Sequence, residues 1–138
     1  MATISTNDRW DELKWANTIG LRGLGSEELD WNLAGSYEVY NLNGIGIDTS
    51  LFDAFVLGNV RIKSKQKYFA KVHGRSVFSG YRKGEMNAEI NVGTLLKEWG
   101  RCAVWGRYRS AQPDYWYLTY RSNHFEWDNS FDQEKEVA

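Results

Sequence analysis

The sequence predicts an all-β protein, folded as a single antiparallel barrel with a short N-terminal helix. Thirteen glycines and a single proline suit strands joined by tight turns. Aromatic residues, which favour strands, make up 15% of the chain. Several segments alternate apolar and polar residues with a period of two, as half-buried antiparallel strands do. The 138 residues are expected to form one domain over residues 1–127, followed by an acidic, loosely ordered tail at 128–138.

The first predicted element is a helix over about residues 7–19. An acidic variant of the capping box begins at Ser5, and Trp10, Leu13 and Ala16 then recur at helical spacing. We expect this helix to flank or plug the barrel, because amphipathic helices usually pack against a core.

Short strands are predicted for most of the remaining chain. Met86–Val92 is the clearest, because its apolar and polar residues alternate without a break. Residues 51–57 are either a buried strand or a short helix, and residues 94–99 are predicted to form one helical turn. The other predicted strands cover residues 37–42, 60–65, 68–78, 102–109 and 115–122.

The last two predicted strands form a hairpin around a turn at residues 110–114. If Arg109 pairs with Tyr115, one face of this hairpin sets arginines opposite tyrosines, with Trp105 beside them. This face is the candidate ligand-binding surface. It consists of Trp105, Arg107, Arg109, Tyr115, Tyr117 and Arg121.

Arginines beside aromatic rings offer cation–π contacts and planar hydrogen-bond donors. If the candidate surface lines a barrel interior, it forms a pocket for a small hydrophobic or aromatic ligand, including an anionic one. If it faces solvent, it suits single-stranded nucleic acid, with bases on the rings and phosphates on the arginines. The remaining readings are a purely stabilising role in the sheet and a structural or protein-interaction surface, since Tyr, Trp and Arg are enriched at interface hot spots.

Charge is unevenly distributed, although the net charge is −1. Residues 1–59 carry three basic and nine acidic side chains, whereas residues 60–121 carry thirteen basic and four acidic ones. Residues 122–138 carry one basic and five acidic side chains. A basic middle attracts anionic partners and favours the nucleic-acid alternative, unless the acidic flanks pack against it and neutralise it.

The sequence holds no recognisable motif for a metal or a cofactor, so we expect neither. His73 and His124 are far apart and have no cysteine or histidine at metal-ligand spacing. Whether the protein is an enzyme is left open. An enzyme of this composition would be a cofactor-independent isomerase, cyclase or lyase, using acid–base or templating chemistry.

Candidate catalytic residues are Glu89, Tyr117 and Arg107, which would polarise a bound substrate. Paired-carboxylate catalysis is a second option, because several acidic side chains lie on separate predicted elements and are free to converge in space. These carboxylates are Glu38, Asp48, Asp53, Glu85 and Glu89.

The stretch LAGSYEVY, residues 33–40, resembles the opening of a calycin barrel, the superfamily of lipocalins and fatty-acid-binding proteins. In that family a glycine, one further residue and an aromatic begin the first strand. Gly35 and Tyr37 take these places, with tyrosine where the family prefers tryptophan, and Arg121 is similar to a late-strand arginine of the family. The resemblance implies a closed up-and-down barrel with an internal ligand pocket, and a few such barrels act as cyclases or isomerases. An OB-like barrel is the alternative fold.

The sequence predicts a soluble, cytoplasmic protein with no membrane partner. Cys102 is the single cysteine, which fits a reducing compartment. The N-terminal residues contain no apolar run, and no segment approaches the ~18 apolar residues of a membrane-spanning helix. The leading function is binding of a small ligand inside the barrel, and homo-oligomerisation is left open.

Overall fold

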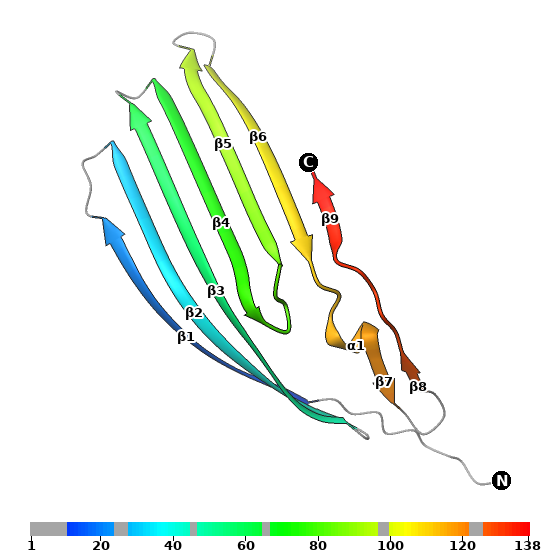
Figure 1. The fold of residues 1–138 in the computed structure, drawn as a ribbon. Coiled ribbons are helices and arrows are strands. Elements are labelled where there is room, and N and C mark those ends of the chain that lie inside the picture. The colour runs from blue at the N-terminus through cyan, green and yellow to red at the C-terminus, as the bar shows by residue number, and fades with distance from the viewer. Residues whose placement is uncertain (1–10, 24–27, 45–46, 65–66, 97–99, 122–125) are drawn as a thin grey trace, which may run out of the picture.

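The protein is an open antiparallel sheet of six long strands and one short strand, accompanied by a two-stranded ribbon (Figure 1). The computed structural model describes residues 11–23, 28–44, 47–64, 67–96, 100–121 and 126–138. The strands of the sheet are β1 (Asp11–Gly23), β2 (Leu29–Gly44), β3 (Ile47–Ser64), β4 (Tyr68–Gly80), β5 (Met86–Leu96), β6 (Gly100–Ala111) and β9 (Glu134–Val137). The ribbon pairs β7 (Thr119–Arg121) with β8 (Glu126–Asp128), and α1 (Tyr115–Leu118) is a single helical turn.

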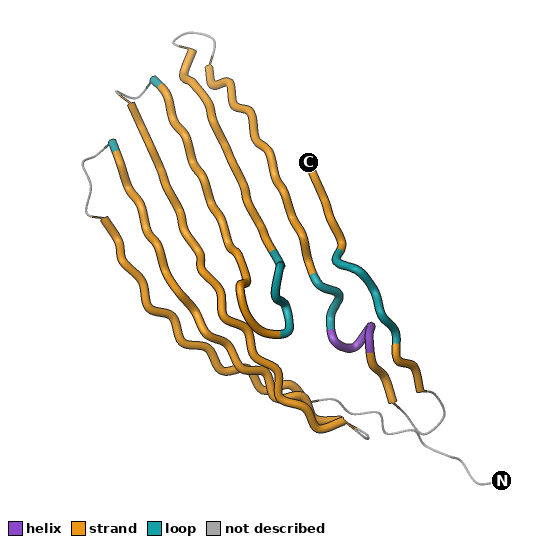
Figure 2. The backbone as a smooth tube through the Cα atoms, viewed as in Figure 1, coloured by secondary structure: helices purple, strands orange, loops and turns teal. Residues whose placement is uncertain are grey.

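The sheet is a meander, since β1 to β6 each pair with the next strand along the chain (Figure 2). β9 returns to pair with the last residues of β6. The sheet does not close on itself among the described strands, because β1 forms one edge and residues 100–106 of β6 form part of the other. The all-β antiparallel prediction is thus confirmed, but the expected closed barrel is not what the described residues form.

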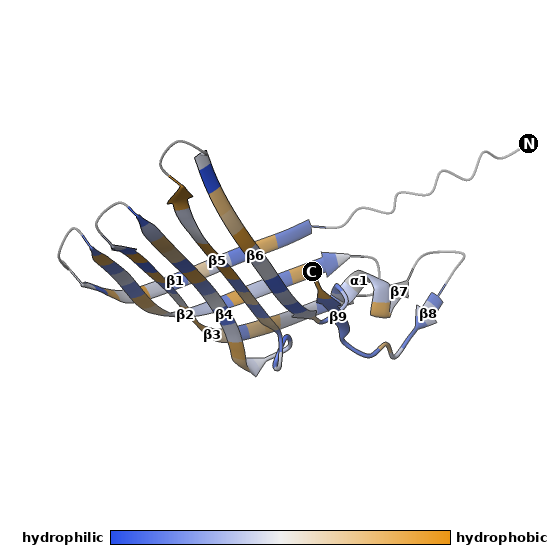
Figure 3. Ribbon diagram, turned by 90° about the horizontal axis from the view of Figure 1, so that it is seen from above, coloured by the Kyte–Doolittle hydropathy of each residue, from blue (hydrophilic) through white to orange (hydrophobic). Residues whose placement is uncertain are grey.

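The two sides of the sheet differ sharply in polarity, because residues directly opposite each other in the register project to the same side. The alternation is visible along the long strands of the sheet in Figure 3. We call one side the apolar face. It includes Leu13, Trp15, Ile19, Leu21, Leu33, Tyr37, Phe52, Val56, Val60, Ile62, Tyr68, Val72, Phe78, Met86, Ile90, Val92 and Val104, all of them exposed.

The opposite side, the polar face, carries most of the charged and amide side chains of the strands. Its members include Lys14, Arg22, Asp30, Asn32, Glu38, Asp53, Asn59, Arg61, Lys63, Lys71, His73, Arg75, Asn87, Glu89, Asn91, Arg101, Arg107 and Arg109. The buried apolar side chains of the described residues, Tyr40, Leu42, Phe55 and Val77, are also on this face. The large apolar face therefore has no core packed against it.

The predicted N-terminal helix is wrong for the residues that the structure describes. Residues 11–23 form β1, which pairs with β2 over its whole length. Residues 7–10 of the predicted helix lie outside the described residues. The period-two alternation of Leu13, Trp15, Ile19 and Leu21 with polar or small residues suits a strand, and pairing with β2 determines the outcome. Among the described residues, the helical element is the single turn α1. No helix in the described ranges is long and apolar enough to cross a membrane.

Two further predictions near the C-terminus are corrected by strand pairing. Thr94–Leu96 continues β5 rather than starting a helical turn, and residues 97–99 lie outside the description. Residues 134–137, expected in a loosely ordered tail, form β9 against Tyr108–Ala111 of β6.

The predicted hairpin between residues 102–109 and 115–122 does not form. β6 pairs with β5 on one side and with β9 on the other, so Arg109 lies opposite Asn87 and Glu136 rather than Tyr115. Tyr115 instead begins α1.

Residues 81–84 form the turn between β4 and β5, which lies at one end of the polar face. Gly80 and Gly84 have φ of 108° and 92°, a left-handed conformation that glycine adopts without strain. At Gly80 a Cβ would collide with the carbonyl oxygen of Phe52. The turn is held to β3 by the backbone N–H of Tyr81, which donates to the same Phe52 oxygen at 2.9 Å.

Candidate functional site

A row of polar side chains crosses the middle of the polar face. Asn32, Asn59, His73, Glu89 and Arg107 lie directly opposite one another on the successive strands β2 to β6. Asn59 Nδ2 donates to Asn32 Oδ1 at 2.8 Å, and His73 Nδ1 lies 2.8 Å from Asn59 Oδ1. Arg107 Nε is 3.7 Å from Glu89 Oε1. We call these five residues the polar row.

The polar row borders a hollow of about 610 Å³ on the same face. Beside the row, its lining includes Asp30, Arg61, Lys71, Asn91 and Trp105. Of the predicted site residues, Glu89, Trp105 and Arg107 line this hollow together. Trp31, Val60, Val72, Ile90 and Gly106 complete its lining. The amide, charged and indole groups of this mixed lining can bind water and charged or polar solutes.

The other residues of the predicted site lie elsewhere. Arg109 and Tyr117 line a second hollow near α1, together with residues 111–114 and Phe131. Tyr115 packs edge-to-face on Tyr81, with ring centroids 6.0 Å apart. Arg121 belongs to β7, and its side chain lies outside the description. The six residues are separated because the hairpin that was to unite them does not exist.

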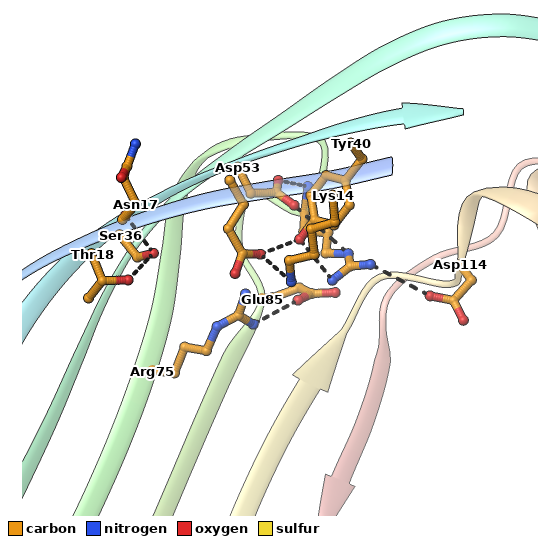
Figure 4. A network of polar contacts seen from close by, with 11 residues as sticks. Lys14, Asn17, Thr18, Ser36, Tyr40, Asp53, Arg75, Glu85 and Asp114 are labelled. Carbon is orange, nitrogen blue, oxygen red and sulfur yellow. Dashed lines mark hydrogen bonds and ion pairs between the residues drawn. The ribbon is translucent and has the colours of Figure 1, made fainter. Parts of the chain in front are cut away.

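A cluster of ion pairs occupies the end of the polar face next to the β4–β5 turn (Figure 4). Lys14 Nζ lies 3.0 Å from Glu38 Oε2, and the Tyr40 hydroxyl donates to the same carboxylate. Arg75 Nη1 lies 3.3 Å from Glu85 Oε2. Three carboxylates of the predicted set, Glu38, Asp53 and Glu85, are thus brought together and buried, but cationic and hydrogen-bonding groups surround them.

Arg82 links this ion cluster to the turn. Its backbone N–H donates to Asp53 Oδ1 at 2.7 Å, and its guanidinium lies 3.9 Å from the carboxylates of both Asp53 and Asp114. It also lies 5.0 Å from the centre of the Tyr40 ring. Burial alone would lower the pKa of Arg82, but Tyr40, Glu85, Asp53 and Asp114 raise it above its usual value. The arrangement fixes the turn on the polar face.

The described part of the chain shows no group of three or more His, Cys, Asp or Glu side chains placed to hold a metal ion. Asp48 and Glu89 do not join the ion cluster: Asp48 is exposed, and Glu89 pairs with Arg107. Sequence reasoning missed Asn32, Asn59 and Arg82. Asn32 and Asn59 are far apart in the sequence, and no local pattern marks them as site residues. Only the strand register, which places them opposite each other, identifies them.

Comparison with known proteins gives one match that covers nearly the whole chain. Residues 3–138 match the model of a family described as "Putative porin". The chain belongs to this porin family. No curated protein and no solved structure matches it.

Membership of the porin family overturns two expectations from the sequence. The predictions of a cytoplasmic location and of no membrane partner are wrong, because a porin is a membrane protein. The calycin resemblance is likewise not supported beyond the antiparallel β-structure. Gly35 and Tyr37 lie in the middle of β2, with Tyr37 on the exposed apolar face, rather than at the start of a first strand.

Proposed function

We propose that the seven-stranded sheet is a sector of a transmembrane β-barrel whose polar face lines an aqueous passage. The observation that carries this proposal is the exposed apolar face, which extends across β1 to β6. Soluble proteins rarely expose so large an apolar surface, whereas lipid requires it. Hydrophilic residues on the opposite face, including the polar row, suit a water-filled interior.

Strand length agrees with this proposal. A β-strand tilted by about 45° spans a bilayer with about 9–11 residues. The six strands β1 to β6 are 11 to 18 residues long. Each is therefore long enough to cross the hydrocarbon layer.

The two edges of the sheet demand further pairing in this setting. Unpaired backbone N–H and C=O groups cost several kcal/mol each in hydrocarbon, so open sheet edges do not occur there. We infer that β1 and residues 100–106 of β6 pair with additional strands that complete the barrel.

The decisive experiment compares two neighbouring positions of β4 in lipid vesicles. Val72 is on the apolar face and Lys71 on the polar face. In a Cys102→Ser background, Lys71→Cys is expected to react with a charged, water-soluble thiol reagent, and Val72→Cys to be protected. Both should react after unfolding in urea. Equal reactivity of the two cysteines in vesicles would argue against a lipid-facing apolar surface.

Binding of a small ligand remains a prediction within this framework. Trp105, Arg107 and Glu89 share a hollow, so a solute that occupies it would lie in the proposed passage. The nucleic-acid and protein-interaction alternatives, and the enzyme chemistry that the sequence left open, likewise stay predictions.

A further inference from the structure

We propose that the passage prefers anions, and that a group of four cations on the polar face attracts them. This basic sector consists of Arg61, Lys63, Lys71 and Arg101. It lies on β3, β4 and β6, near the ends of the strands joined through residues 65–67 and 97–99. The inference rests on the proposed function, since it concerns the solutes that such a passage admits.

The position of the basic sector is not explained by sheet stability. Arg61 and Lys71 are directly opposite each other in the register of β3 and β4. Like charges in this arrangement destabilise a sheet. Arg61 also has Asp30 opposite it on β2, but the carboxylate of Asp30 is engaged by Arg22, with Nε–Oδ1 at 3.4 Å.

Carboxylates do not neutralise the sector. From the polar row to the loop end, the polar face carries six cations, Arg22, Arg61, Lys63, Lys71, Arg101 and Arg107. The described strands carry two carboxylates there, Asp30 and Glu89, so their balance is 6 − 2 = +4. Glu28 and Lys67, which come directly before β2 and β4, add one charge of each sign and leave this balance unchanged. Both strand carboxylates are paired, with Arg22 and Arg107. In the described part of the chain, Arg61, Lys63 and Lys71 have no ion-pair partner.

Arg101 is held in place by an aromatic ring rather than by an acid. Its guanidinium lies 3.9 Å from the centre of the Phe69 ring. Gly93 lies opposite Phe69 on β5, and a Cβ there would collide with the Phe69 ring. The missing side chain leaves room for the ring, which supports a cation without cancelling its charge.

The opposite end of the polar face has a different character. There the cations Lys14, Arg75 and Arg82 are each within 4 Å of a carboxylate. The positive charges are therefore neutralised in the ion cluster at one end of the polar face. In the basic sector at the other end, they are not neutralised by carboxylates. Clefts lined by one sign of charge raise the local concentration of counter-ions by about tenfold or more. Small inorganic, carboxylate or phosphate anions fit this chemistry.

Lipid phosphate is the other source of anions near a membrane protein. The register places the basic sector on the polar face, on the side of the sheet opposite Val60, Ile62 and Val72. Headgroups around the barrel would meet the apolar face instead. The anions that the sector attracts are thus solutes of the passage.

The test is a measurement of ion selectivity with the full-length protein. It is reconstituted in planar bilayers of zwitterionic lipid, and the reversal potential is recorded across a tenfold KCl gradient. We expect chloride to be preferred over potassium. Lys71→Glu should lower the chloride-to-potassium permeability ratio, and combining it with Arg61→Glu and Lys63→Glu should make potassium the preferred ion.

Lys83→Glu is the matched control, because it makes the same charge change in the turn beyond the other end of β4. Nine residues separate Lys71 from Gly80, which is about 30 Å of strand. This exceeds the Debye length of about 10 Å at 0.1 M salt severalfold, so the selectivity should not change. Lys71→Gln provides a neutral variant, with an intermediate ratio expected.

The outcomes separate the inference from the proposed function. Channels that prefer potassium, or whose selectivity is the same in the native protein and the triple variant, would overturn the anion preference and leave the passage intact. A correctly folded protein that inserts into the bilayer and conducts no ions would defeat the passage itself, and the inference with it.

Discussion

Tyr68 and Phe78 lie on the apolar face of β4, ten positions apart, with side chains 63% and 57% exposed. At about 3.3 Å per residue, the two positions are about 33 Å apart along the strand. A tilt of about 40° reduces this to about 25 Å along the barrel axis, the height of the apolar band of outer-membrane barrels. Aromatic side chains form girdles at both borders of that band. Within the proposed membrane barrel, we therefore expect these two rings at the two membrane interfaces.

This placement predicts a depth profile along β4. Nitroxide labels on Tyr68→Cys, Val72→Cys and Phe78→Cys, each in the Cys102→Ser background, are compared in vesicles. Collisions with oxygen should be most frequent at position 72, and collisions with a water-soluble nickel chelate more frequent at positions 68 and 78. A label on His73→Cys, on the polar face, should meet the chelate despite its depth. A flat profile over the three apolar-face positions would contradict the assignment.

A charge placed in the middle of the apolar face should be costly. Val72 lies between the two aromatic positions, and an arginine at the bilayer midplane destabilises a barrel by about 2–4 kcal/mol. We expect Val72→Arg to lower the free energy of unfolding by this amount, measured by urea titration of tryptophan fluorescence in lipid vesicles. Lys71→Arg, which places arginine on the polar face next door, should change it by less than about 0.5 kcal/mol. Equal effects would show that both faces are solvated.

The strands of the central sheet were largely predictable, but the environment of their faces was not. In Met86–Val92 the alternation assigns Ile90 and Glu89 to opposite sides, as the register shows. The same alternation arises in a soluble barrel with a packed interior and in a membrane barrel with an apolar exterior. The two kinds of barrel are distinguished by whether a core packs against the apolar face. This depends on the whole fold and cannot be read from the alternation within one strand.

The predictions that failed concern pairing between distant segments. Residues 13 and 16 match a helical stripe as well as a strand, and the choice is made by β2, whose Asn41 and Glu38 lie opposite them. Likewise, residues 115–118 were expected to pair with β6, but that edge is taken by β9 from the C-terminal end of the chain. The local pattern of apolar and polar residues does not show which distant strand pairs with a given sheet edge.

The hydrogen bond from Arg82 to Asp53 should be a major determinant of stability at the turn. The Asp53 side chain is fully buried, with 0% exposure, and accepts the Arg82 backbone N–H at 2.7 Å. Asp53→Ala removes this acceptor and the carboxylate beside the Arg82 guanidinium. Hydrogen bonds to charged groups contribute about 1.5–3 kcal/mol, so we expect a loss of about 2–3 kcal/mol in urea unfolding.

Asp48→Ala is the control for this change, because it removes an exposed carboxylate from the same strand. It should leave the free energy of unfolding within about 0.5 kcal/mol of the native value. If Asp53→Ala were equally mild, the ion cluster would not be what fixes the turn.

Tyr81, in the same turn, should make stability depend on alkaline pH. Its hydroxyl donates to the carbonyl oxygen of Pro113 at 3.0 Å. Burial raises the pKa of Tyr81 to about 12, from an ordinary value near 10. The fold thus favours the neutral phenol. Its contribution to stability is fully present below about pH 10 and is lost as the pH rises from there through about 12.

Urea unfolding at pH 9 and at pH 12 measures this contribution. The native protein should lose stability between the two values, and Tyr81→Phe, which cannot ionise, should lose less. At pH 9 the variant should itself be less stable, by about 1 kcal/mol for the missing hydrogen bond to Pro113. Tyr117→Phe is the control, since Tyr117 is 68% exposed and should behave as the native protein does at both pH values. The same pH dependence in Tyr81→Phe and in the native protein would mean that ionisation of Tyr81 does not destabilise the turn, because other groups would then account for the whole loss.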